Sequence, residues 1–196
     1  MEKLGEGIYF RDTPGHGYID LSPDKQAMIP DEFKIAGASY EEDCAYNIPY
    51  YFLYNLLTCN KQAKEEYEKG LKSWYWREYE KCFNVTLQPG ESHQKDAFMF
   101  FKKYTGSFLV RCAWGDHYND FPPEYTGKDY VRLLACKIAP DNEDDISPKT
   151  TEDKYFFIKG DKYNQHADEG HGFIIENHGF DCIEVMESKA FYKRVV

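Results

Sequence analysis

The amino-acid sequence predicts an α+β protein, with helices mainly in the N-terminal half and an antiparallel or mixed sheet mainly in the C-terminal half. Two observations predict this class: apolar residues recur at helical spacing between residues 61 and 83, and runs rich in β-branched and aromatic residues follow residue 107. Early helices followed by late strands favour α+β over an alternating βαβ arrangement. With 196 residues and no marked shift in composition, the chain is expected to form a single domain over residues 1–196.

The first thirty residues predict a strand pair and a short helix. Residues 7–11 and 18–21 are short apolar runs separated by the turn formers Thr13-Pro14-Gly15-His16-Gly17, which is typical of a hairpin. Ser22-Pro23 provides the N-cap and first residue of a short helix, which Pro30 ends.

The remaining elements follow from periodicity and turn residues. Tyr67, Leu71 and Trp74 lie at helical spacing, so one amphipathic helix of about six turns is expected from residue 61 to 83. Pro49 is expected to kink a helix or to start a new one over residues 50–58, because its ring blocks the hydrogen bond to residue 45. A short helical or mixed segment should reach residue 104. Five strands are then expected, at residues 107–114, 130–138, 154–159, 172–176 and 182–186.

The charge and the cysteines narrow the classes of function. The formal net charge of −10 repels a phosphate backbone, so direct nucleic-acid binding is disfavoured and a basic protein partner is favoured. The most apolar stretch, residues 48–57, is too short to span a bilayer, and the N-terminus has no apolar signal region, so a soluble, cytoplasmic protein without a membrane partner is expected. None of the six cysteines forms a C-x-x-C pair, which favours free thiols.

The stretch ASYEEDCAYNIPYYF, residues 38–52, sets three consecutive acids against a cysteine and several aromatic residues. Its first interpretation is structural: Ser39 followed three residues later by Glu42 is the capping-box pattern of a helix N-terminus. Glu41 and Asp43 would then lie in the first helical turn, where the helix dipole favours negative charge.

The second interpretation is a functional site. A catalytic set would consist of His16, Glu42, Asp43 and Cys44, with the acids as base or ligands and His16 transferring protons. The three neighbouring acids should raise the pKa of Cys44 and so oppose a nucleophilic thiolate. The candidate cofactor is a divalent metal, and the alternative is that the protein has no cofactor. Two ligand sets are open for the metal: His16, Glu41 and Asp43, or His166, Asp168, His171 and His178.

Several motifs of the first third resemble a domain of unknown function found in bacterial, plasmid and phage proteins. These motifs are Gly7-Ile8-Tyr9-Phe10, Gly15-His16-Gly17, Leu21-Ser22-Pro23, Ile29-Pro30 and Tyr40-Glu41-Glu42-Asp43-Cys44-Ala45-Tyr46, within about residues 5–55. The chain departs from the family pattern at Tyr18, where a glycine is usual, and at Tyr46, where a tryptophan is usual. The resemblance implies a context of mobile elements and phages, and it implies no reaction.

Three functions remain open from the sequence. The leading hypothesis is a phage or mobile-element accessory protein that binds a host or element-encoded protein, with counter-defence as one such role. A metal-dependent or Cys/His hydrolase built on His16 and residues 41–44 is the alternative, so enzymatic activity is undecided. A small-ligand binder with an aromatic pocket is the third, because 17 Tyr, 14 Phe and 3 Trp exceed ordinary aromatic content.

Overall fold

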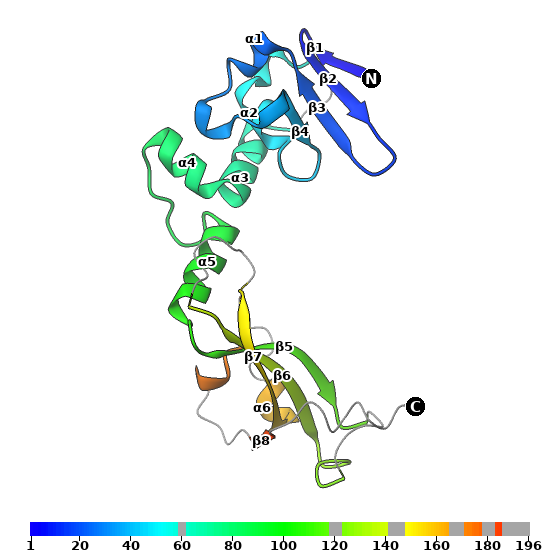
Figure 1. The fold of residues 1–196 in the computed structure, drawn as a ribbon, viewed down its shortest axis with the longest axis vertical. Coiled ribbons are helices and arrows are strands. Elements are labelled where there is room, and N and C mark those ends of the chain that lie inside the picture. Colours follow the sequence, from blue (N-terminus) through cyan, green and yellow to red (C-terminus); the bar gives the residue numbers. More distant parts are fainter. Residues whose placement is uncertain (59–61, 118–122, 141–147, 165–170, 178–182, 186–196) are drawn as a thin grey trace. The chain divides into compact units, whose positions relative to one another are not determined.

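The computed structural model describes residues 1–58, 62–117, 123–140, 148–164, 171–177 and 183–185. The chain forms two compact units, residues 1–96 and 97–196, and each is described by itself. Each unit holds a four-stranded antiparallel sheet with accompanying helices (Figure 1), so the α+β class is confirmed. The sequence predicted that residues 1–196 form a single domain. Whether the two units together make one domain is not tested by their separate descriptions, so this stays a prediction. Every helix in the described residues is too short or too polar to cross a membrane.

The sheet of unit 1 is a meander of four strands. They are β1 (Glu2–Gly5), β2 (Ile8–Asp12), β3 (Gly17–Leu21) and β4 (Ser39–Glu41), hydrogen-bonded in that order. The hairpin expected from the sequence is confirmed, because Ile8 pairs with Leu21 and Asp12 pairs with Gly17. Burial alternates along β3, and Ile19 is almost fully covered, as expected of a strand with one face on the core.

Short helices cover the core face of this sheet. They are α1 (Pro23–Gln26), α2 (Asn47–Phe52), α3 (Lys64–Trp74) and α4 (Trp76–Phe83), with 3-10 turns at Asp31–Phe33, Ala36–Ala38 and Tyr54–Leu56. The core joins strand and helix residues: Ile8 and Tyr40 from the sheet pack in one cluster with Ile48 of α2 and Leu71 of α3. Burial of such side chains stabilises each by roughly 1.5–3 kcal/mol.

The single helix predicted over residues 61–83 is wrong, because two helices form and break at Tyr75. The backbone of Tyr75 has φ −129° and ψ 43°, which is not helical. A straight helix would carry apolar residues on two adjacent faces, and one neighbour can bury only one of them. The break lets Tyr75 and Trp76 both pack against the core, while Trp74 remains 47% exposed.

The helix around Pro49 also differs from the expectation. Residues 47–52 form α2, with Pro49 in its first turn, and a 3-10 turn at Tyr54–Leu56 follows. The first four N–H groups of a helix have no intrahelical acceptor, so a proline at this position removes no hydrogen bond. The predicted kink is therefore absent from α2.

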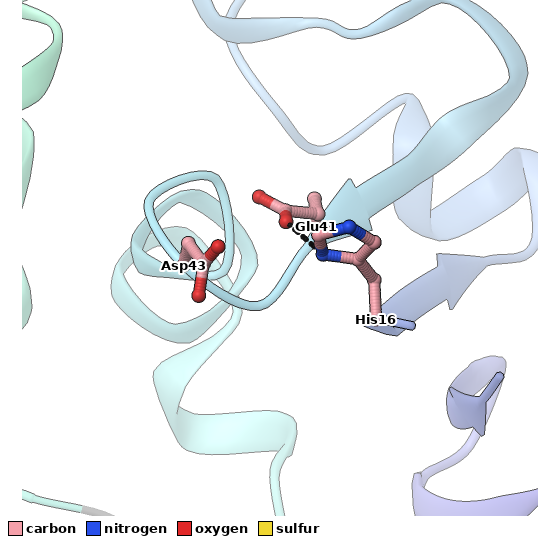
Figure 2. A group of neighbouring side chains, drawn as sticks. All are labelled: His16, Glu41 and Asp43. Atoms are coloured by element: carbon pink, nitrogen blue, oxygen red, sulfur yellow. Dashed lines mark ion pairs between the residues drawn. The ribbon is translucent and has the colours of Figure 1, made fainter. Parts of the chain in front are cut away.

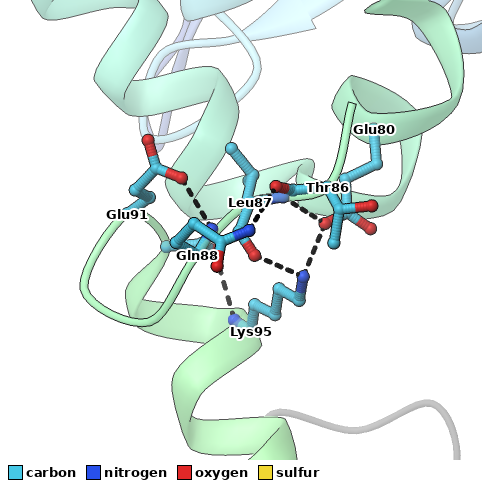
Figure 3. A network of polar contacts seen from close by, with 7 residues as sticks. Glu80, Thr86, Leu87, Gln88, Glu91 and Lys95 are labelled. Atoms are coloured by element: carbon cyan, nitrogen blue, oxygen red, sulfur yellow. Dashed lines mark hydrogen bonds and ion pairs between the residues drawn. The ribbon is translucent and has the colours of Figure 1, made fainter. Parts of the chain in front are cut away.

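Polar contacts fix the irregular segment 84–92, which connects α4 to α5 (His93–Lys103). The Lys95 ammonium donates to Glu80 Oε1 at 2.6 Å and to the Leu87 carbonyl at 2.7 Å, and Glu80 Oε1 also accepts the Leu87 N–H at 2.7 Å (Figure 3). The Lys95 and Glu80 side chains are only 16% and 20% exposed. This arrangement, the Lys95 clamp, therefore works in a partly dehydrated environment, where ion pairs are screened less than at the surface.

The sheet of unit 2 contains β5 (Phe108–Gly115), β6 (Tyr130–Ile138), β7 (Thr150–Lys159) and β8 (Ile183–Val185), and α6 (Gly160–Asn164) follows β7. Strands are thus confirmed in four of the five predicted ranges. Residues 172–176 do not form the predicted strand: Ile174 makes one bridge to Leu109, and a 3-10 turn begins at Ile175. The Glu176 carboxylate accepts the Phe108 N–H at 3.0 Å, so a side chain occupies the donor that a continuing strand would need.

Candidate functional site

The pairing of β3 with β4 brings the histidine turn next to the acidic loop. Tyr18 pairs with Glu41 in the antiparallel register, so residues 42–46 continue beside the turn that contains His16. The Glu42 N–H donates to the Gly17 carbonyl at 3.0 Å, which extends the contact by one residue. The site is therefore built at the end of a strand pair and on the turn that follows it.

The capping-box prediction for Ser39 and Glu42 is wrong, because Ser39 begins a strand and not a helix. Ser39 Oγ donates to Asp20 Oδ1 at 2.6 Å and accepts from the Arg11 guanidinium at 3.0 Å. The hydrogen bonds from Arg11 hold the pKa of the Asp20 carboxyl below its usual value. The three residues lie on adjacent strands, so a partner across the sheet has taken the place of the local cap.

A turn occupies residues 42–46, and α2 begins only at Asn47. The turn is closed by the Tyr46 N–H, which donates to the Glu41 carbonyl at 2.9 Å. The buried Asn47 side chain supports it by donating to the Cys44 carbonyl at 2.8 Å. These contacts fix the backbone that carries Glu42, Asp43 and Tyr46.

Within this frame, His16, Glu41 and Asp43 gather at one point, and we call them the His16 triad (Figure 2). His16 Nδ1 lies 2.9 Å from Glu41 Oε1, and one ligand atom of each residue lies within 4.8 Å of the other two. Zinc binds nitrogen and carboxylate ligands at about 2.0–2.2 Å, so two ligand atoms of one ion lie at most about 4.4 Å apart. A small movement of these side chains, of which His16 and Asp43 are exposed and Glu41 is half-buried, brings all three within reach of one cation.

The remaining members of the predicted catalytic set lie near this triad and differ in surroundings. Burial raises the pKa of the Cys44 thiol, and the Glu41 and Asp43 charges raise it further. A thiol in this environment stays protonated at neutral pH, which is unfavourable for a nucleophile. Glu42 is not one of the grouped ligand residues, and it lines a pocket. The use of these residues in catalysis stays a prediction.

The second predicted metal set cannot be assembled from the described residues. His166, Asp168 and His178 lie outside them. His171 is described, and its ring centroid lies 5.8 Å from that of Phe100 in unit 2.

The pocket beside the triad has a volume of about 450 Å³ and is mostly aromatic. We call it the tyrosine pocket, and its lining residues are Phe10, Ile19, Glu42, Tyr46, Tyr50, Gln62 and Tyr67. The Tyr50 and Tyr67 rings are stacked with centroids 4.8 Å apart, and the Tyr46 ring stands at 77° and 86° to them. Pockets of this size and aromatic character are typical of ligand sites.

The lack of a side chain at Gly17 shapes the rim of this pocket. A Cβ at Gly17 would collide with the Glu42 carboxylate and with the edge of the Phe10 ring. The glycine therefore lets an acid from the turn 42–46 and an aromatic ring of β2 meet beside the pocket.

The residues of the tyrosine pocket were not identified individually from the sequence, which predicted only an aromatic pocket. Tyr46 and Tyr50 lie four residues apart, the spacing that places two side chains on one helical face. That spacing was the available signal. Tyr67 lies beside them because α3 packs on α2, and no local sequence pattern predicts that packing.

Comparison with known proteins identifies a family of domains. A family model described as a domain of unknown function, DUF7007, matches residues 1–105, which is more than half of the chain. No curated protein and no solved structure matches the chain. The matched range includes the sheet of unit 1, the His16 triad and the tyrosine pocket, and it confirms the resemblance to an uncharacterised domain inferred from residues 5–55. The chain therefore belongs to the DUF7007 family.

Proposed function

We propose that this protein is an accessory protein of a phage or mobile element that acts by binding a host or element-encoded protein. The observation that carries the proposal is the tyrosine pocket, which offers aromatic side chains of the kind enriched at protein interfaces. The net charge of −10 favours a basic partner over a nucleic acid. Counter-defence is one role that such binding would serve in the cytoplasm of the host.

Buried aromatic anchors contribute much of the free energy of protein association, so one tyrosine of the pocket should dominate binding. Tyr50 and Tyr51 form a matched pair for this test, because both are half-buried residues of α2 and only Tyr50 lines the pocket. Tyr51 instead lies under the Lys64 ammonium, which is 4.5 Å from its ring centroid.

The experiment uses the tagged full-length chain expressed in the host, followed by quantification of co-purified proteins. A partner that binds through the pocket should be depleted by Tyr50→Ala by at least about tenfold and retained by Tyr51→Ala. The captured protein is then purified and titrated against both variants. Equal recovery of every captured protein by the two variants would contradict the proposal.

A second candidate function is metal-dependent hydrolysis, which the His16 triad favours. Two carboxylates and one imidazole are ligands suited to a divalent transition metal, and three protein ligands leave a coordination position for water. A metal-bound water has a lowered pKa and is the usual nucleophile of such enzymes.

Equilibrium dialysis against Zn²⁺ or Mn²⁺ tests this candidate. One ion per chain should bind to the wild type and be lost in Glu41→Gln and in Asp43→Asn. Glu6→Gln is the matched control, because Glu6 lies in the turn between β1 and β2, outside the triad. Retention of the ion by both triad variants would exclude this site.

A further inference from the structure

We infer that the tyrosine pocket recognises a basic side chain of the partner, with the aromatic rings facing the cation and the Glu42 carboxylate balancing its charge. The inference rests on the proposed function and specifies its ligand chemistry. Three features of unit 1 support it. They are the residues that line the pocket, the lack of a partner for the Glu42 carboxylate among the described residues, and a cation–ring contact elsewhere in the same unit.

The wall of the pocket combines four aromatic rings with a single formal charge. Phe10, Tyr46, Tyr50 and Tyr67 contribute rings, and Glu42 is the one ionisable acid or base among the described lining residues apart from the tyrosines. The face of an aromatic ring carries negative electrostatic potential, so several rings attract a cation and gain little from an anion. The Glu42 carboxylate and the aromatic rings therefore both favour a positively charged ligand.

Glu42 is available to a ligand, since its carboxylate makes no hydrogen bond or ion pair to any residue that the structure describes. Its position is nevertheless fixed at the backbone, by the hydrogen bond from its N–H to the Gly17 carbonyl. An acid held at the rim beside apolar rings is well placed to pair with the head of a long side chain whose stem lies along the wall.

Unit 1 already uses this kind of contact within the chain. The Arg11 guanidinium lies 4.7 Å from the Tyr18 ring centroid, and there the Asp20 carboxylate completes the arrangement by accepting the guanidinium hydrogen bonds. The combination of a ring face, a basic group and a carboxylate is therefore compatible with this sheet. The tyrosine pocket brings together the same two kinds of group, four aromatic rings and the Glu42 carboxylate.

The defined probes are the Nα-acetyl methylamides of lysine and arginine, with that of norleucine as the uncharged counterpart of lysine. They are titrated into the full-length protein labelled with ¹³C in its tyrosine rings, and the Tyr46 and Tyr50 signals are assigned with single variants. The basic probes are expected to shift these signals with dissociation constants about 2- to 30-fold below that of norleucine, the range of a cation–π contribution.

Glu42→Gln should weaken the lysine probe by about two- to fivefold, as expected for an exposed ion pair, and should leave the norleucine probe unchanged. Glu6→Gln, which removes the same charge outside the pocket, should have no effect on either probe. Thermal unfolding of both variants verifies that they are folded.

Two outcomes would overturn the inference. If norleucine binds as tightly as lysine, the pocket is an apolar site, and the proposed partner binding through Tyr50 still stands. If none of the three probes shifts the pocket signals at concentrations up to its solubility limit, the pocket does not recognise a basic side chain. Conversely, probe binding together with equal partner capture by Tyr50→Ala and Tyr51→Ala would refute the proposed function and leave the ligand chemistry intact.

Discussion

The contact between Gly70 and Asn47 allows a prediction in which the usual effect of a substitution is reversed. Gly70 lies inside α3, where replacing glycine by alanine normally stabilises a helix by about 1 kcal/mol. A Cβ at this position would instead overlap the buried carboxamide of Asn47. That carboxamide donates to the Cys44 carbonyl and holds the turn of the candidate site.

Gly70→Ala must therefore displace Asn47. Overpacking a core position costs about 1–3 kcal/mol, and leaving a buried hydrogen-bonding group without its partner costs a further amount of about 1–3 kcal/mol. After subtraction of the gain in helix propensity, the free energy of unfolding should fall by about 1–5 kcal/mol.

The cycle with Asn47→Ala isolates this cause. Once the carboxamide is absent, Gly70→Ala should be neutral or stabilising by up to about 1 kcal/mol, because only the propensity term is left. Urea unfolding followed by tryptophan fluorescence, in a Trp114→Phe background so that Trp74 and Trp76 of unit 1 report, measures all four variants. If Gly70→Ala stabilises the wild type, or changes stability equally in both backgrounds, the explanation is refuted.

Three further predictions concern charged groups of unit 1. Lys95→Met should lower the free energy of unfolding by about 1–3 kcal/mol, because it removes the cation that pairs with the partly buried Glu80 carboxylate. Lys69→Met, which removes an exposed ion pair, should lower it by at most about 1 kcal/mol. Urea unfolding of both variants measures the difference. Because the folded-state pKa of Asp20 is lowered, its stabilising contribution is complete above the unfolded pKa of about 3.9 and is lost as the pH falls through the folded value. Asp20→Asn should consequently lose less stability than the wild type when the pH falls from neutrality to below about 4, as monitored by thermal unfolding. Cys44 should react slowly with iodoacetamide at neutral pH, and Glu41→Gln should accelerate the reaction by removing one of the charges that raise the thiol pKa; an unchanged rate would contradict this cause.

Elements with strong local signals could be predicted from the sequence. The turn formers at residues 13–17 determine the hairpin of β2 and β3, and the strand at residues 130–138 is found with its predicted bounds. Both signals are local, because a turn and a run rich in β-branched and aromatic residues are encoded within a few consecutive residues.

Features decided by contacts between distant residues could not be predicted in this way. Ser39 has the local pattern of a helix cap, and its partner Asp20 on the neighbouring strand decides the outcome. The break at Tyr75 has neither proline nor glycine to mark it, since it results from the packing of two apolar faces. The ligand atoms of the His16 triad were candidates from residue type alone, and their proximity follows from the register of β3 and β4.

The Lys95 clamp also changes how the turn Gln88-Pro89-Gly90 should be interpreted. Proline and glycine after a helix often mark the edge of a folded body, where the chain leaves for a linker. Here the contacts of Lys95 with Glu80 and Leu87 close the intervening segment into a loop. Closing that loop costs chain entropy when unit 1 folds. The turn is therefore an internal part of unit 1. A proline-glycine turn that follows a helix therefore lies inside unit 1, which ends after it at Asp96.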